Sequence, residues 1–179
     1  MNRLFSILVA MALTGVVVSC GEKKKNSNII ITHKPVTPVV KETQKMNDDE
    51  QSHDVSWVGS NYKVVVQRMA DTSLPVVQID DYTKYYDNKI TVRVLRKDGT
   101  EFFNHAFTKA DFDGYLDQDT KDTGVLQGIV FVKAEGDELL FAASVGSPDA
   151  VSDEYVPMVV KITRMGAISI SPDTSLDTE

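Results

Sequence analysis

Short segments in which apolar and polar residues alternate follow one another from about residue 61 to residue 171, and glycine-containing turns separate several of them. Alternation with a period of two is typical of β-strands that bury one face. The pattern predicts an all-β fold, mainly an antiparallel meander arranged as a sandwich or a partly closed barrel, with one short helix. We expect two strands, over 61–69 and 74–79, ahead of three hairpins.

The first hairpin is predicted over 90–107, where Asp98-Gly99 offers a two-residue type I′ turn. In this register Arg96 lies opposite Glu101 and forms a cross-strand ion pair with it. One face of the hairpin is then apolar except for His105, and a slip by one residue would destroy this match.

The second hairpin is predicted over 129–145, with a Glu135-Gly136 turn that pairs Val130 with Phe141. Both faces of these strands are apolar, which favours central strands that are covered on both sides.

The third hairpin is predicted over 156–171. A three-residue loop with Gly166 in the left-handed region places Ile162 opposite Ile168, whereas a two-residue loop would place Thr163 there. The hydrophobic match selects the three-residue loop with its bulge.

The helix is predicted over 108–116. Thr108 followed by Asp111 forms a capping box, and an apolar stripe at helical spacing follows.

The N-terminal segment has a short basic start and then no charge over residues 4–18, a run too short to span a hydrocarbon core of about 30 Å. These features are typical of a secretory signal, here residues 1–19. The run ends in VVSC, which resembles a bacterial lipobox and implies acylation of Cys20. The alternative is a free thiol behind an ordinary signal; the chain contains no second cysteine to pair with it.

Lipidation would place the protein in the cell envelope, with the membrane as its partner through the anchor on Cys20. Gly21, rather than an aspartate, follows the cysteine. This implies an outer-membrane lipoprotein that faces the periplasm or the cell surface. Acylation also consumes the thiol, so the mature chain has no cysteine for catalysis, a disulfide or a metal.

Residues 20–52 are mostly polar and are interpreted as the lipidated cysteine and a flexible tether, followed by one antiparallel β domain over 53–179. The alternative is that residues 29–31 dock as an edge strand. The domain has 12 lysines and arginines against 21 acidic residues, a net charge of −9. Nucleic acid is therefore not an expected partner.

Candidate catalytic groups are sparse. His105 lies between Phe103 and Phe107 on the apolar face of the first hairpin, where a structural histidine is favoured over a general base. The chain lacks a nucleophile elbow, a P-loop, a zinc-protease motif and a dinucleotide fingerprint, so we expect no cofactor.

Five aspartates between residues 111 and 122 could offer oxygen ligands to calcium. The residues are Asp111, Asp113, Asp117, Asp119 and Asp122. Their spacing does not match an EF-hand loop, and acids that cap a helix explain them better, so no metal is expected.

A cluster of three tyrosines lies in the segment DDYTKYYDN, at Tyr82, Tyr85 and Tyr86. Tyrosines among acids and an amide can stack on sugar rings and hydrogen-bond to their hydroxyls, so these residues, with His105, are candidates for ligand binding. Core packing and loop polarity are the alternative explanation.

Several segments, among them CGEKKK, KYYDNKITVRVLRKDGTEFFNHAFTKADF and DEYVPMVVKITRMGAISIS, are similar to a family of Bacteroidetes lipoproteins whose β-rich domain has no assigned function. The similarity covers nearly all of residues 20–179 and implies a small cell-envelope lipoprotein. It transfers no catalytic residue.

Two functions follow as hypotheses. The first is a lipid-anchored, non-catalytic domain that binds an envelope protein or a glycan. The second is a hydrolase that acts on polysaccharide through paired carboxylates chosen among Asp80, Asp81, Asp87 and Glu101. A glycosidase needs two carboxyl groups about 5–10 Å apart in a cleft.

Overall fold

A computed structural model describes residues 42–149 and 152–174, all within one compact unit, residues 37–179. The elements are β1 (Asp49–Trp57), β2 (Ser60–Ala70), β3 (Val76–Gln78), β4 (Lys84–Tyr86), β5 (Asn88–Arg96), β6 (Glu101–Phe107), the 3₁₀ helix η1 (Lys109–Tyr115), α1 (Gln118–Thr123), β7 (Val125–Glu135), β8 (Glu138–Gly146), β9 (Tyr155–Thr163) and β10 (Ile168–Pro172).

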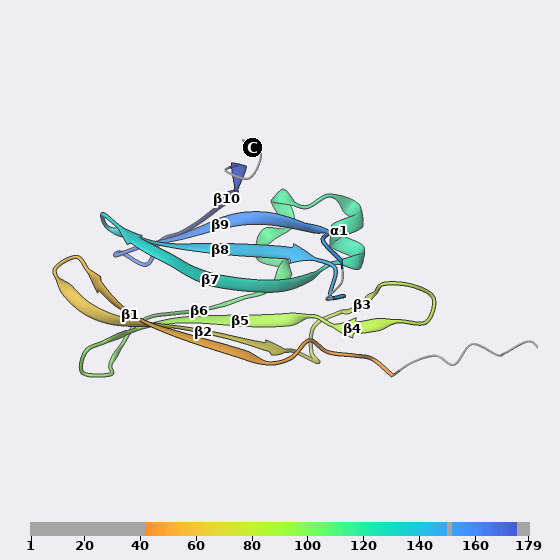
Figure 1. Ribbon diagram of the computed structural model, residues 1–179, viewed down its shortest axis with the longest axis horizontal. Coiled ribbons are helices and arrows are strands. Elements are labelled where there is room, and N and C mark those ends of the chain that lie inside the picture. The colour runs from red at the N-terminus through yellow and green to blue at the C-terminus, as the bar shows by residue number, and fades with distance from the viewer. Residues whose placement is uncertain (1–41, 150–151, 175–179) are drawn as a thin grey trace, which may run out of the picture. The chain divides into compact units, whose positions relative to one another are not determined.

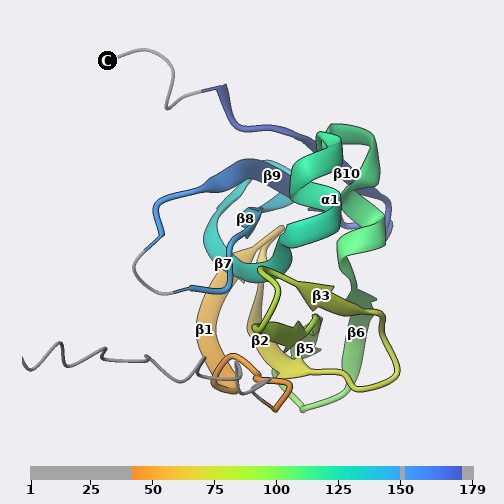
Figure 2. The ribbon, with the colours of Figure 1, turned by 90° about the vertical axis from the view of Figure 1, so that its right-hand side faces the viewer.

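Two four-stranded antiparallel sheets form the two layers seen in Figure 1. The strand order is β1-β2-β5-β6 in one sheet and β10-β9-β8-β7 in the other. The predicted all-β class is confirmed, and of the two arrangements left open the sandwich is the one present. The strands β3 and β4 form a small separate sheet at the end that carries α1 (Figure 2).

The core lies between the two sheets and follows the predicted alternation. In β5, Ile90, Val92 and Val94 are fully buried and the residues between them are not. They belong to one cluster with Leu139, Phe141, Met158, Val160 and Ile162 of β8 and β9. Because side chains alternate between faces, this cluster fixes the register of both sheets.

The predicted register of the β5–β6 hairpin is confirmed from Ile90 to Val94, since Ile90, Val92 and Val94 pair with Phe107, His105 and Phe103. The predicted turn is wrong. Arg96 N–H donates to the Thr100 carbonyl at 2.8 Å, which closes a three-residue loop in which Gly99 alone has a positive φ, of 83°.

A bulge follows from this loop, so Glu101 lies opposite Leu95 instead of Arg96. The expected ion pair is absent, because the Arg96 guanidinium donates to the Glu101 backbone carbonyl at 2.7 Å and lies over the Phe102 ring.

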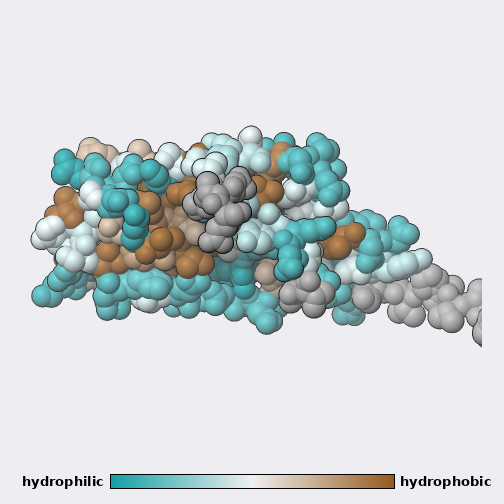
Figure 3. Space-filling view, turned by 45° about the horizontal axis from the view of Figure 1, so that its top comes forward, coloured by the Kyte–Doolittle hydropathy of each residue, from teal (hydrophilic) through white to brown (hydrophobic). Residues whose placement is uncertain are grey.

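The β7–β8 hairpin turns one residue later than predicted. Glu135 pairs with Glu138 around Gly136 and Asp137, and Phe141 lies opposite Phe131 rather than Val130. Two bulges in β7 shift its register. β8 is a central strand as expected, but β7 is an edge strand whose Val130 and Val132 are 43% and 57% exposed. Apolar residues form a band at the end that carries this turn (Figure 3).

The β9–β10 hairpin is as predicted, with Ile168 opposite Ile162 and Gly166 at φ 78° in the loop. The predicted helix is present as η1, and Asp111 accepts a hydrogen bond from the Thr108 N–H at 2.7 Å. The second helix, α1, was not predicted.

The first strand begins at Asp49, inside the segment interpreted as a tether. Before it, Gln44 lies beside β4: its N–H donates to the Lys84 carbonyl at 2.8 Å, and its carbonyl accepts from the Tyr86 N–H at 2.9 Å. The structured domain therefore begins no later than Gln44. The alternative edge strand over 29–31 lies outside the described residues.

Candidate functional site

A pocket of about 390 Å³ is lined by residues of β3, η1 and α1. Figure 2 shows these elements together at one end of the sandwich. Residues 74–77 form its apolar wall. Its polar residues are Asp87, Thr108, Lys109, Asp113, Lys121 and Asp122. A second pocket of similar volume lies at the β1–β2 and β5–β6 turns, and its ion pair, Lys63–Asp54, is exposed.

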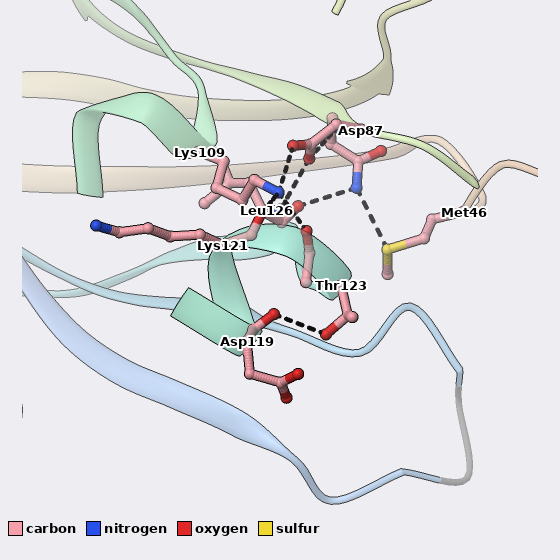
Figure 4. Close-up of polar contacts among 9 residues, drawn as sticks. Met46, Asp87, Lys109, Asp119, Lys121, Thr123 and Leu126 are labelled. Carbon is pink, nitrogen blue, oxygen red and sulfur yellow. Dashed lines mark hydrogen bonds and ion pairs between the residues drawn. The ribbon is translucent and has the colours of Figure 1, made fainter. Parts of the chain in front are cut away.

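Asp87 lies between β4 and β5 and is only 4% exposed. Its Oδ1 accepts hydrogen bonds from the backbone N–H groups of Asn88, at 2.7 Å, and Leu126, at 2.9 Å. Leu126 belongs to β7, so this carboxylate joins the two sheets at the pocket end (Figure 4).

Lys109 approaches the same carboxylate from η1. Its Nζ lies 3.8 Å from Asp87 Oδ2 and donates to the backbone carbonyls of Lys121 and Gly124, each at 2.6 Å. These carbonyls lie at the C-terminal end of α1, where a cation is favoured by the helix dipole. Lys109 therefore holds η1, α1 and the β4–β5 junction together (Figure 4).

Asn88 completes the buried polar group. It is fully buried, and its Nδ2 donates to the Leu126 carbonyl at 2.9 Å and to Met46 Sδ at 3.3 Å. Within the described part of the chain its Oδ1 has no hydrogen-bond partner. A buried acceptor without a partner is costly, so this site is not optimised for stability alone.

Burial raises the pKa of the Asp87 carboxyl, although the N–H groups of Leu126 and Asn88 and the Lys109 ammonium act in the opposite direction. An ionisable group that is both buried and perturbed, in a pocket with an apolar wall, is typical of a functional site. We therefore take this pocket as the candidate site.

The three predicted tyrosines do not gather at the pocket, and none of them lines it. Tyr85 and Tyr86 are consecutive residues of β4 and so point to opposite faces. Tyr82 lies in the β3–β4 turn and is 43% exposed. Their role in ligand binding stays a prediction.

His105 lies where the hairpin register placed it, half-buried on β6. Its ring is 4.5 Å from that of Phe107 and 6.4 Å from that of Phe103, measured between centroids. It lies outside the pocket, and a role in binding stays a prediction.

The carboxylates proposed for a hydrolase are dispersed. Asp87 directly precedes β5, whereas Glu101 pairs with Leu95 near the other end of β5, which separates the two carboxylates by about 26 Å along the strand at about 3.3 Å per residue. Asp80 and Asp81 lie in the β3–β4 turn and do not line the pocket.

Two aspartates of the acidic segment 111–122 cap helices. Asp111 caps η1, and Asp117 caps α1 by accepting a hydrogen bond from the Thr120 N–H at 2.7 Å, which lowers the pKa of Asp117. In residues 42–149 and 152–174, no three acidic, histidine or cysteine side chains gather to hold a metal. Over the same residues, no helix is long and apolar enough to cross a membrane. Cys20 lies outside the described residues.

Sequence reasoning named Asp87 only as one of several acids and missed Lys109 altogether. The partners of Asp87 come from η1 and β7, which lie far from it along the chain, so no local motif marks the site.

The fold and the pocket define a small antiparallel β-sandwich domain with a mixed polar and apolar pocket, a class that serves many functions. The chain matches the family described as a domain of unknown function (DUF4738) over residues 29–170 and belongs to that family. The match confirms the expectation of a domain without an assigned function and includes part of the segment interpreted as a tether. A comparison with curated proteins found no match.

Proposed function

We propose that this protein is a lipid-anchored envelope lipoprotein, of the kind found in Bacteroidetes, whose sandwich domain is a non-catalytic binding module for an envelope protein or a glycan. The lipobox-like VVSC sequence supports the anchor at Cys20 in the outer membrane. The observation that carries the binding role is the pocket in which the apolar wall of residues 74–77 lies beside the buried Asp87.

The chemistry of the pocket supports binding over hydrolysis. Asp87 has an ammonium as its ion-pair partner, and its Oδ1 is occupied by two backbone N–H groups. Neither Asp80, Asp81 nor Glu101 lines the pocket with it. An apolar wall with a few fixed polar groups is the usual composition of a binding site.

A pair of matched substitutions tests this function. Ala110 is an exposed residue of η1 that lines the pocket, and Ala142 is an exposed residue of β8 that does not. Ala110→Arg fills the pocket without removing a core contact, and Ala142→Arg adds the same side chain elsewhere.

The full chain, tagged and expressed in its own host, is purified from envelope membranes, and bound proteins and glycans are identified by mass spectrometry. We expect Ala110→Arg to lose the component that the wild type and Ala142→Arg retain. Equal recovery with all three chains would show that the pocket is not the binding site.

A further inference from the structure

Among residues 42–149 and 152–174, the strand β3 is paired on one side only, by β4. On the far side of β4, Gln44 bonds to the outward-pointing backbone groups of Lys84 and Tyr86. Because these groups point away from β3, the pairs Val76–Tyr86 and Gln78–Lys84 are the non-hydrogen-bonded pairs of the β3–β4 ladder.

The backbone N–H and C=O groups of Val76 and Gln78 therefore point to the free edge of β3. No residue of the described ranges forms a hydrogen bond with them. Donors and acceptors repeated at every second residue along an edge match the backbone of one added strand. This spacing selects an extended polypeptide over a sugar or a compact small molecule.

This edge opens into the candidate pocket. Val76 and Val77 line the pocket from β3, and Ala110 of η1 and Lys121 of α1 line it from the other side. Figure 2 shows β3 between β4 and the helices. A groove between a strand edge and a helix is a known geometry for capturing a peptide by strand addition.

We propose that an extended segment of an envelope protein binds as an added strand on the free edge of β3. Its backbone bonds to Val76 and Gln78, and alternate side chains enter the pocket against residues 74–77. This inference rests on the proposed function and gives the chemical class of its ligand. Pro75 has no N–H, so the added ladder begins after it.

Two substitutions at one position separate backbone from side-chain binding. Gln78→Pro removes the outward-pointing N–H of residue 78. We expect the fold to be retained, because the β3–β4 ladder does not use this N–H and proline is tolerated on an edge strand. Gln78→Ala removes the side chain and keeps the N–H. Thermal melting of both variants checks that the domain remains folded.

The probe is a phage-displayed library of random decapeptides, panned against residues 20–179 of the wild type. For an enriched peptide we expect Gln78→Pro to raise the Kd about tenfold and Gln78→Ala to change it less than about twofold. Amide exchange measured by NMR gives a readout on the wild type itself. The Val76 and Gln78 amides are expected to exchange fast in the free protein and slowly with the peptide bound.

Three results would overturn this inference. The first is that no peptide is enriched, and the second is that the enriched peptides bind Gln78→Pro as well as the wild type. The third is slow exchange of both amides without peptide, which would show that the edge is already covered by the chain's own N-terminal residues or by a second copy. If Ala110→Arg abolishes envelope binding and Gln78→Pro does not, the pocket is the binding site and the strand-addition mode is wrong.

Discussion

Replacing Asp87 by alanine tests whether this carboxylate holds the pocket end of the sandwich together. The change leaves the N–H groups of Asn88 and Leu126 without their acceptor in a buried site, at about 1–3 kcal/mol each. It also leaves the Lys109 ammonium without its counter-ion. We expect a loss of about 3–5 kcal/mol, a large share of the roughly 5–15 kcal/mol that stabilises a domain.

Urea unfolding followed by the fluorescence of Trp57, the single tryptophan of the chain, measures this loss. The reporter is suitable because Trp57 is buried against Tyr62 and Phe102. Asp54→Ala is the matched control, since Asp54 forms an exposed ion pair with Lys63, and it should cost less than about 1 kcal/mol. An Asp87→Ala chain that unfolds within about 1 kcal/mol of the wild type would refute the structural role.

The Asp87→Asn variant and the pH dependence of stability separate the contribution of the Asp87 charge from that of its hydrogen bonds. The amide oxygen can still accept from both N–H groups, so this variant should be about 2 kcal/mol more stable than Asp87→Ala. Burial raises the folded-state pKa of Asp87 above 3.8, so the folded state binds this proton more tightly than the unfolded chain does. The stability of the wild type relative to Asp87→Asn should therefore fall as the pH rises from 3.8 through the folded-state pKa, and a rise would contradict the assigned direction.

Two further predictions concern the β1–β2 turn and the membrane anchor. Val58 has a φ of 49° in the β1–β2 turn and is 46% exposed. Because asparagine tolerates this backbone conformation, Val58→Asn should raise the free energy of unfolding by about 1 kcal/mol. An unchanged urea midpoint would argue against backbone strain at Val58. Cys20→Ala should move the protein from the membrane to the soluble fraction, whereas the control variant Lys23→Ala should stay membrane-bound. Retention of both variants in the membrane after a carbonate wash would exclude the lipid anchor.

The sequence predicted hairpins well where one face was clearly apolar. The β9–β10 pairing followed from matching Ile162 with Ile168, and the β5–β6 pairing from its alternating valines. In β7 and β8 both faces are apolar, so the pattern could not choose a register. Two bulges in β7 then shifted the pairing, and bulges are set by contacts between sheets that the local sequence does not contain.

Turn geometry was harder to predict than strand pairing. Asp98-Gly99 resembles a two-residue turn, yet Asp98 does not adopt a positive φ, and a three-residue loop forms instead. At Val58-Gly59 a turn forms although the residue type argues against it, because a valine occupies a left-handed position that its branched side chain disfavours. No turn preference would have placed a hairpin there.

The site was the least predictable part, for a topological reason. Asp87 lies at the point where the chain passes from the small β3–β4 sheet into β5, and its partners enter from η1 and β7. The pocket arises because β3–β4 is a separate sheet at one end of the sandwich and leaves one edge of β3 facing the helices. Neither feature has a signal in composition or periodicity.

The position of Gln44 links the pocket to the proposed anchor. The chain enters the domain alongside β4, in the same small sheet whose other edge forms a wall of the pocket. If Cys20 holds the protein at the membrane, the β3–β4 end is where the chain from the anchor joins the domain. A partner of the pocket must then reach that end of the domain, which a narrow extended segment does more easily than a bulky folded surface. The small sheet thus pairs with Gln44 on one edge, and its other edge is the one that we propose to bind an added strand.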